Sequence, residues 1–292
     1  MKNESAKQLQ ALLASNDLLI TPCCSDALTG KLIEHAGFSL MFMSGFCVSA
    51  ARIGGPDLGL ISFGEMLDQA RNINSAVNIP IIADGDTGYG NAMNVKRTVR
   101  EYAAAGIAGI MIEDQVSPKR CGHTQGKQVV DFVSAQKRIE AAVDAKGESD
   151  GILIMARTDA LRLNGIDDAI RRAQSFLELG ADITFVEAPE SEEQMRRICD
   201  EIEGPKMTNQ LAGGLTPILP QDVLSEMGFK IAAYPFALLN AMIGGVQKAL
   251  TNLRNNETPC SELSFAELRE ILGFNQYYEE EKKYVISDQT ES

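Results

Sequence analysis

The chain has 292 residues, of which 45% are hydrophobic, and a formal net charge of −13 at pH 7. This acidic balance argues against a nucleic-acid-binding surface and against binding to anionic membranes. No uncharged apolar run reaches the length of about 18 residues that a transmembrane span needs. The six cysteines lack the spacing of a disulfide framework, and the N-terminal residues lack the apolar segment of a signal peptide, so we expect a reducing, cytoplasmic setting.

Strand-like and helix-like segments alternate along the chain after a first helix. Residues 5–15 have helical periodicity and are expected to form a lid helix before the first strand. Apolar runs of strand length lie at 18–21, 39–43, 80–83, 108–112, 152–156, 183–186, 206–208 and 230–234. Amphipathic helical segments lie at about 25–36, 63–77, 92–105, 133–146, 167–179, 191–203, 220–227 and 236–254.

These strand–helix units match the number that a closed (β/α)8 barrel of the TIM type requires. A doubly wound open sheet is the rival arrangement, and we favour closure because no linker divides the chain into halves. We therefore predict a catalytic barrel over residues 1–255 and a C-terminal helical extension over 256–292 that is not an independent domain. A capping box at Ser264-Phe-Ala-Glu267 begins a helix that is expected to continue through Tyr278.

Polar side chains follow six consecutive predicted strands, from the second to the seventh. In a parallel barrel these strand ends share one face, where the βα loops build the active site, so we predict the functional site there. The segments concerned are Ser44-Gly45, Asp84-Gly-Asp86, Glu113-Asp114, Arg157-Thr-Asp159, Glu187 and Asn209-Gln210.

Carboxylates dominate the ends of the third and fourth strands. Asp84 and Asp86 are two residues apart, so on a strand both point to one side, and Glu113 from the next strand would join them. Such an all-oxygen cluster suits Mg²⁺ or Mn²⁺. The alternative is a set of turn carboxylates that accept local backbone bonds, although like charges this close need a cation. Asp57 is either a further member or an ordinary turn residue.

The loop from Glu113 to Lys127 carries Cys121 among basic residues. Lys119 and Arg120 precede the thiol and His123 follows it, and positive neighbours are expected to favour the thiolate. Cys121 is thus a candidate for proton transfer or nucleophilic attack, on a loop whose glycines allow it to close. A solvated basic loop with an incidental cysteine is the alternative.

Arg157 has two possible roles. Its guanidinium group could donate two hydrogen bonds to a substrate carboxylate, or it could form a salt bridge to Glu187 or Asp84.

Over about residues 8–284 the chain resembles the isocitrate lyase/phosphoenolpyruvate mutase superfamily. The resemblance is carried by Ser44-Gly45-Phe46, Gly55-Pro-Asp57, Asp84-Gly-Asp-Thr-Gly-Tyr-Gly90, Ile112-Glu-Asp-Gln115, Lys119-Arg-Cys-Gly-His123, Ala156-Arg-Thr-Asp159 and Phe185-Val-Glu-Ala188. The segment around Cys121 resembles the lyase signature, whereas phosphonomutases lack that cysteine. The chain is similar in size to 2-methylisocitrate lyase, 2,3-dimethylmalate lyase and the petal death protein.

The resemblance implies a metal site, a substrate pocket and a set of catalytic residues. Mg²⁺, or alternatively Mn²⁺, would be bound directly by Asp86. Three further carboxylates would hold it through water: Asp57, Asp84 and Glu113. The substrate-binding residues would be Ser44, Gly45, Phe46, Gly122, His123, Arg157 and Asn209. The catalytic residues would be Lys119, Cys121, His123, Arg157 and Glu187.

The resemblance also implies a function. It is that of a Mg²⁺-dependent carbon–carbon lyase of the oxo-acid-lyase type, acting on a 2-hydroxy dicarboxylate or tricarboxylate such as a 2-alkylmalate or 2-methylisocitrate, with Cys121 as proton donor. The alternatives are an oxaloacetate hydrolase or decarboxylase and an isomerase of the phosphonomutase type. Methylisocitrate lyases have tyrosine where Phe42 stands, so the residues do not identify the base. A homotetramer, a dimer of dimers with the C-terminal helix exchanged between subunits, is implied as well.

Overall fold

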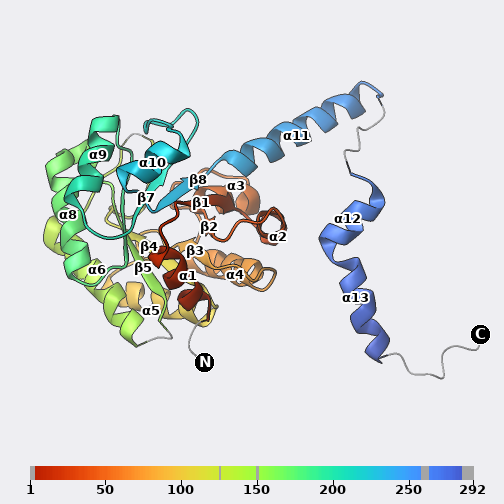
Figure 1. Cartoon of the computed structure of the whole chain (residues 1–292), viewed down its shortest axis with the longest axis horizontal. Coiled ribbons are helices and arrows are strands. Elements are labelled where there is room, and N and C mark those ends of the chain that lie inside the picture. The colour runs from red at the N-terminus through yellow and green to blue at the C-terminus, as the bar shows by residue number, and fades with distance from the viewer. Residues whose placement is uncertain (1–3, 125, 149–150, 258–262, 285–292) are drawn as a thin grey trace, which may run out of the picture. The chain divides into compact units, whose positions relative to one another are not determined.

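The computed structural model describes residues 4–124, 126–148, 151–257 and 263–284. Eight parallel strands pair in chain order and close into a barrel, because β8 pairs with β1 (Figure 1). The strands are β1 (Leu19–Cys24), β2 (Met41–Met43), β3 (Ile81–Asp84), β4 (Gly109–Glu113), β5 (Leu153–Thr158), β6 (Ile183–Val186), β7 (Lys206–Asn209) and β8 (Ile231–Tyr234). The predicted (β/α)8 barrel is confirmed, and the doubly wound open sheet is excluded.

Helices surround the barrel. They are α1 (Glu4–Ala14), α2 (Ala27–His35), α3 (Gly45–Ile53), α4 (Phe63–Asn74), α5 (Ala92–Ala104), α6 (Phe132–Gly147), α7 (Leu161–Asn164), α8 (Ile166–Glu178), α9 (Glu192–Glu201) and α10 (Gln221–Met227). Helix α11 (Ala237–Arg254) follows β8 in the chain. The sequence did not predict α3 and α7. Helix α3 begins directly after β2, where the side chain of Ser44 accepts the backbone N–H of Cys47 and caps the helix.

Side chains on alternate strand residues pack on opposite sides of the barrel wall. In β3, Ile82 belongs to an interior cluster to which every strand contributes, whereas Ile81 and Ala83 pack outward against the helices. The lid helix α1 also adds to the interior. Its Leu9 is fully buried in the interior cluster, beside Gly109 at the start of β4. Helix α1 therefore closes the end of the barrel at which the strands begin, opposite the predicted site.

The chain divides into two compact units, Met1–Asn240 and Ala241–Ser292. The second unit holds most of α11, then α12 (Phe265–Leu272), α13 (Phe274–Glu281) and a short 3₁₀ helix η1 (Lys282–Tyr284). The predicted capping box at Ser264 is confirmed. The expected continuous helix is wrong, because Gly273 adopts a φ of +85° and separates α12 from α13. The boundary at residue 255, the dependence of the extension on the barrel and its exchange between subunits stay predictions.

Among the described helices, none combines the length and the apolar character required to cross a lipid bilayer.

Candidate active site

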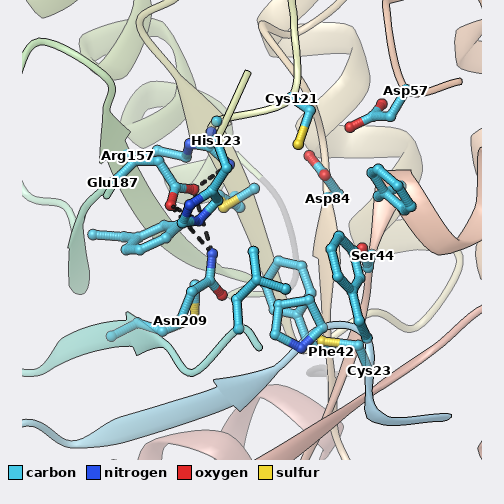
Figure 2. Close-up of a pocket in the computed structure, with 18 residues that line it drawn as sticks. Cys23, Phe42, Ser44, Asp57, Asp84, Cys121, His123, Arg157, Glu187 and Asn209 are labelled. Atoms are coloured by element: carbon cyan, nitrogen blue, oxygen red, sulfur yellow. Dashed lines mark hydrogen bonds and ion pairs between the residues drawn. The ribbon is translucent and has the colours of Figure 1, made fainter. Parts of the chain in front are cut away.

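A cavity lies at the carboxyl-terminal ends of the strands (Figure 2). Its polar lining includes Ser44, Asp57, Asp84, Cys121, His123, Arg157, Glu187 and Asn209. Its apolar lining includes Phe42, Phe46, Phe185, Leu211, Pro235 and Phe236. Most residues predicted for the site therefore line one cavity, together with Gly122. The others, Gly45, Asp86, Glu113 and Lys119, are buried and do not line it.

The period of a strand explains why these side chains face inward. Five predicted site residues stand two positions after a residue of the interior cluster, so they project to the same side of the barrel wall. They are Asp84, Glu113, Arg157, Glu187 and Asn209, which follow Ile82, Met111, Met155, Phe185 and Met207. The hydrophobic interior thus ends in a polar layer at the mouth of the barrel.

Asp84 and Asp86 lie together, although not on one strand as predicted. Strand β3 ends at Asp84, and Asp86 follows in a turn with a φ of 47°. The turn folds back, so the backbone N–H of Asp86 donates to Asp84 Oδ1 at 2.9 Å. The N–H of Gly45 donates to Asp84 Oδ2 at 3.1 Å. A substrate carboxylate that uses the Gly45 N–H would have to share that donor with Asp84.

The ammonium group of Lys119 lies among the carboxylates. Its Nζ is 2.6 Å from Asp57 Oδ1 and 2.9 Å from Asp86 Oδ1. Burial raises the pKa of Asp86 to about 7, an effect that Lys119 opposes and that Asp84 and Asp57 reinforce. Burial alone would lower the pKa of Lys119, but the surrounding carboxylates, Asp86 first, raise it well above its ordinary value. Lys119 is therefore a cation that balances the clustered negative charge.

The same carboxylates fit a hard divalent cation. Glu113 Oε1 is buried without a hydrogen-bond partner among the described residues, whereas Asp57 Oδ1 and Asp86 Oδ1 are buried and face the Lys119 ammonium group. A divalent ion bound by Asp57 or Asp86 would therefore replace Lys119 at those oxygens, and Glu113 Oε1 would accept a water of its shell. In the described part of the chain, no three His, Cys, Asp or Glu side chains are arranged to hold an ion by themselves.

Arg157 is surrounded by three carboxylates. Its Nε and Nη2 donate to the two oxygens of Asp159 at 2.8 and 3.0 Å. Its Nη1 lies 3.1 Å from Glu187 Oε2, and its Nε lies 3.3 Å from Glu113 Oε2. Against the effect of burial, these groups raise the pKa of Arg157 well above its ordinary value. The salt bridge to Glu187 that the sequence offered as an alternative is present, and Arg157 also faces the cavity.

The loop after β4 is folded over the cavity. Gln115 and Val129 form an antiparallel bridge at its base, and the Val116 N–H donates to the Gln128 carbonyl at 2.8 Å. The Gln115 side chain bonds the backbone of Arg120 in both directions, at 2.8 and 2.9 Å. We call residues 116–124 and 126–128 the flap. Its tip, residues 121–123, lines the cavity, so the flap is closed.

The flap tip makes close contacts with the barrel. His123 Nδ1 accepts the Leu215 N–H at 3.1 Å, so the ring carries its proton on Nε2, which lies 3.0 Å from Glu187 Oε1. A Cβ on Gly122 would lie only 2.6 Å from Arg157 Nη2 and from Glu187 side-chain carbons. Glycine is therefore required at 122 by close approach in the closed flap, in addition to the backbone freedom that the sequence suggested.

The environment of the Cys121 thiol differs from the prediction. Lys119 is engaged by carboxylates, and the guanidinium group of Arg120 lies beside Gly126. Burial raises the pKa of Cys121, and although the backbone N–H of His123 opposes this effect, Asp57 and Glu187 add to it. The expectation of a thiolate is wrong, because two basic neighbours in sequence are not neighbours of the sulfur. A neutral thiol is a proton donor at pH 7.

We predict that the alkylation rate of Cys121 by iodoacetamide rises at higher pH than that of an ordinary thiol, whose pKa is about 8.5. Only the thiolate attacks, and a raised pKa leaves less thiolate at every pH below it. Peptide mass spectrometry between pH 6 and 10 measures the profile, with glutathione as the reference thiol. A rate for Cys121 that has already reached its plateau at pH 7 would contradict the neutral thiol.

Lys127 and Asp159 belong to the site, and the sequence assigned neither a role. Lys127 Nζ lies 2.9 Å from Asp159 Oδ1 and also donates to the Gly122 carbonyl. The position of Asp159 at the end of β5 was a usable signal for a site residue. No pattern marked Lys127, because its partners are 5 and 32 residues away in the sequence.

Comparisons with known proteins agree with this geometry. A family model described as phosphoenolpyruvate phosphomutase matches residues 9–254. The chain is 40% identical to the 2,3-dimethylmalate lyase of Eubacterium barkeri over 96% of this chain and 98% of the relative. It is 39% identical to the chloroplastic carboxyvinyl-carboxyphosphonate phosphorylmutase of Arabidopsis thaliana over 94% of this chain and 83% of the relative.

Two solved structures are similar over nearly the whole chain. Oxaloacetate acetylhydrolase in complex with 3,3-difluorooxalacetate has a TM-score of 0.93 and 32% identity, with 97% of this chain and 98% of that chain covered. Phosphonopyruvate hydrolase in complex with oxalate and Mg²⁺ has a TM-score of 0.85 and 28% identity, with 96% and 99% covered. The sequence comparisons and the structure comparisons therefore indicate the same group of enzymes.

Proposed function

The chain belongs to the phosphoenolpyruvate mutase/isocitrate lyase superfamily, and on that premise we propose that it is a Mg²⁺-dependent carbon–carbon lyase. It would cleave a 2-hydroxy dicarboxylate or tricarboxylate, of the 2-alkylmalate or 2-methylisocitrate type, to an α-keto acid and a second carboxylate. The observation that carries the proposal is the closed flap, which places a neutral Cys121 thiol in the same cavity as Asp84 and Arg157. The similarity to a named 2,3-dimethylmalate lyase supports it.

The carboxylates would hold the metal, with Asp86 as the direct ligand and Asp57, Asp84 and Glu113 around its waters. When bound, Mg²⁺ would polarise the 2-hydroxyl group and its neighbouring carboxylate. Arg157 would orient the substrate through its fork of donors. Ser44, Phe46 and Asn209 line the same cavity and would complete the pocket.

Cys121 would supply the proton that the reaction consumes. Cleavage of the C2–C3 bond leaves an electron pair on C3, delocalised into the second carboxylate, and the Cys121 S–H proton would move to that carbon. Arg157 and the Nε2–H of His123 would stabilise the negative charge. The closed flap would keep bulk water from competing as a proton source. Phe42 presents a ring without an ionisable group to the cavity, so the base for the 2-hydroxyl proton is another group.

Hydrolysis of oxaloacetate is a second candidate function. The likeness to oxaloacetate acetylhydrolase, with a TM-score of 0.93, favours it. A phosphonomutase-type isomerase is a third, because the Arabidopsis relative carries a phosphorylmutase name. Each alternative would use an α-keto acid in the same cavity.

A product screen tests the proposal. The protein is incubated with Mg²⁺ and, in turn, 2,3-dimethylmalate, other 2-alkylmalates, 2-methylisocitrate, oxaloacetate and phosphonopyruvate. Pyruvate or another α-keto acid from a 2-hydroxy acid, detected by a coupled assay, is the expected result. Oxalate and acetate from oxaloacetate alone would replace the lyase by a hydrolase, and phosphoenolpyruvate seen by phosphorus NMR would replace it by an isomerase. No product from any compound would refute an enzyme of this kind.

We also propose the homotetramer, a dimer of dimers, as the state in solution. Large apolar side chains are exposed along α11 at the spacing of one helix face, which supports an interface with another subunit: Ile243, Val246, Leu250 and Leu253. Sedimentation velocity of the full chain gives the mass of the assembly, and a monomer at micromolar concentration would contradict the proposal. The cytoplasmic setting stays a prediction.

A further inference from the structure

Lys127 is a buried cation on the flap, the loop that is folded over the cavity. Its side chain is 2% exposed. It lies on the returning limb of the flap, next to Gln128, whose carbonyl accepts the Val116 N–H. The backbone at residue 127 is therefore held close to the paired base of the flap, and the side chain extends from there toward the flap tip and β5.

The ammonium group joins the flap tip to the barrel. Its Nζ lies 2.9 Å from Asp159 Oδ1, at the end of β5, and it also donates to the Gly122 carbonyl in the flap tip. Gly122 stands between Cys121 and His123, so the position of its peptide group determines where both side chains begin. A movement of the tip away from Asp159 would break either the bond from Lys127 to the Gly122 carbonyl or the contact of Lys127 with Asp159.

Lys127 also shares a carboxylate with Arg157. Asp159 Oδ1 accepts both Lys127 Nζ and Arg157 Nη2, and Asp159 Oδ2 accepts Arg157 Nε. Burial alone would raise the pKa of Asp159, but Arg157 and Lys127 hold it well below its ordinary value. Without Lys127, Asp159 would keep Arg157 as its cationic partner, and Arg157 also lies close to Glu187 and Glu113.

Another buried lysine shows what a purely structural role looks like. Lys206 Nζ donates to the carbonyls of Ile202 and Gly204, which lie 4 and 2 residues before it in the same chain segment. Those bonds stabilise the turn that leads into β7 and involve no site residue. The partners of Lys127 are instead the flap tip and the carboxylate that orients Arg157.

We propose that Lys127 is a positioning residue, which holds the Gly122 carbonyl and thereby places the Cys121 thiol in the cavity. It acts only through the flap tip and Asp159 and does not touch the reacting atoms. The inference concerns the closed state of the flap, and its catalytic consequence rests on the proposed lyase function.

Selective alkylation of Cys121 tests the inference without substrate. The rate with iodoacetamide at pH 8 is measured by peptide mass spectrometry for the wild type, Lys127→Met, Lys127→Arg and the matched control Lys206→Met. Lys127→Met is expected to raise the rate at Cys121 by about 10- to 100-fold, the range for losing a hydrogen bond to a charged group. Lys127→Arg keeps the charge and the donors, so its rate should stay within about threefold of wild type. Lys206→Met should leave the rate at Cys121 unchanged.

Two outcomes would overturn the inference. One is an unchanged Cys121 rate in folded Lys127→Met. The other is an equal increase at Cys121 and at Cys199 on α9, because that would show general loosening of the protein. If circular dichroism shows that Lys127→Met is unfolded, Lys127→Gln, which keeps a donor amide, replaces it under the same criteria with an expected increase of about three- to tenfold.

Turnover provides an independent readout. With a substrate from the product screen, Lys127→Met should lower kcat by about 10- to 100-fold with a smaller change in KM, and Lys127→Arg should restore most of the loss. Faster alkylation in Lys127→Met, together with a wild type that cleaves no 2-hydroxy acid, would support the flap inference and refute the lyase. A Cys121 alkylation rate in Lys127→Met as slow as that of the wild type, together with an active wild type, would support the lyase and refute the role of Lys127.

Discussion

Replacement of Cys121 by alanine or serine is expected to lower kcat by about two to four orders of magnitude, the usual contribution of a positioned general acid. The thiol lines the cavity and burial keeps it neutral, so it can donate a proton to the carbanion. Serine occupies the same place but is a much weaker acid, so it should not rescue the activity. KM should change little, because the thiol contributes to the transition state more than to substrate binding.

Steady-state kinetics with the substrate found in the screen measure this effect. The matched control is Cys199→Ser on α9, a partly exposed cysteine that does not line the cavity; its kcat should equal that of the wild type. Activity of Cys121→Ser within about threefold of wild type would remove the thiol from the mechanism. The flap would then serve to exclude water, and another group would have to donate the proton.

Replacement of Asp86 by alanine is expected to abolish turnover and the response to metal together. Its Oδ1 is buried and lies 2.9 Å from the Lys119 ammonium group, so as the direct ligand it would exchange that cation for the metal. Lys119 keeps Asp57 as a partner at 2.6 Å in this variant, so the fold should persist. In the wild type, a chelator should remove activity, and Mg²⁺ or Mn²⁺ should restore it.

Metal binding can be followed apart from activity. A ligand at about 100 times its dissociation constant stabilises the folded state by roughly 2.7 kcal/mol, so Mg²⁺ should raise the melting temperature of the chelated wild type. Asp86→Ala should show no such increase, whereas Asp68→Ala should behave as the wild type, because Asp68 is an exposed residue of α4 paired with Arg52. Full wild-type activity in the presence of chelator would refute the metal requirement.

The sequence alone was sufficient for the architecture. Each of the eight predicted strands is present, and the predicted helices between them occur near the expected positions. This was possible because periodicity and strand length are local properties, and because a parallel barrel places all carboxyl ends on one face. The same period of two predicts which residues face the interior, which is why Asp84, Arg157 and Glu187 were correctly placed in one cavity.

Prediction failed where the outcome depended on non-local packing. Asp86 was predicted to lie on the third strand, but that strand ends at Asp84. The polar and glycine residues that follow do not indicate at which residue the backbone pairing of the strand stops. Helix α3 was not predicted, because it begins at Gly45, directly at the predicted strand end, with no polar segment between strand and helix. Cys121 was expected to be a thiolate from its sequence neighbours, but its pKa depends on burial and on Asp57 and Glu187.

By itself, then, the sequence determined the barrel, the face that carries the site and the residue types available there, since these follow from patterns a few residues long. The tertiary structure decided which charges meet. Lys119 lies between Asp57 and Asp86, and Lys127 joins Gly122 to Asp159. The energy of a charge depends on its distance to other charges and on the loss of water around it, and the folded chain sets both quantities through contacts between segments far apart in sequence.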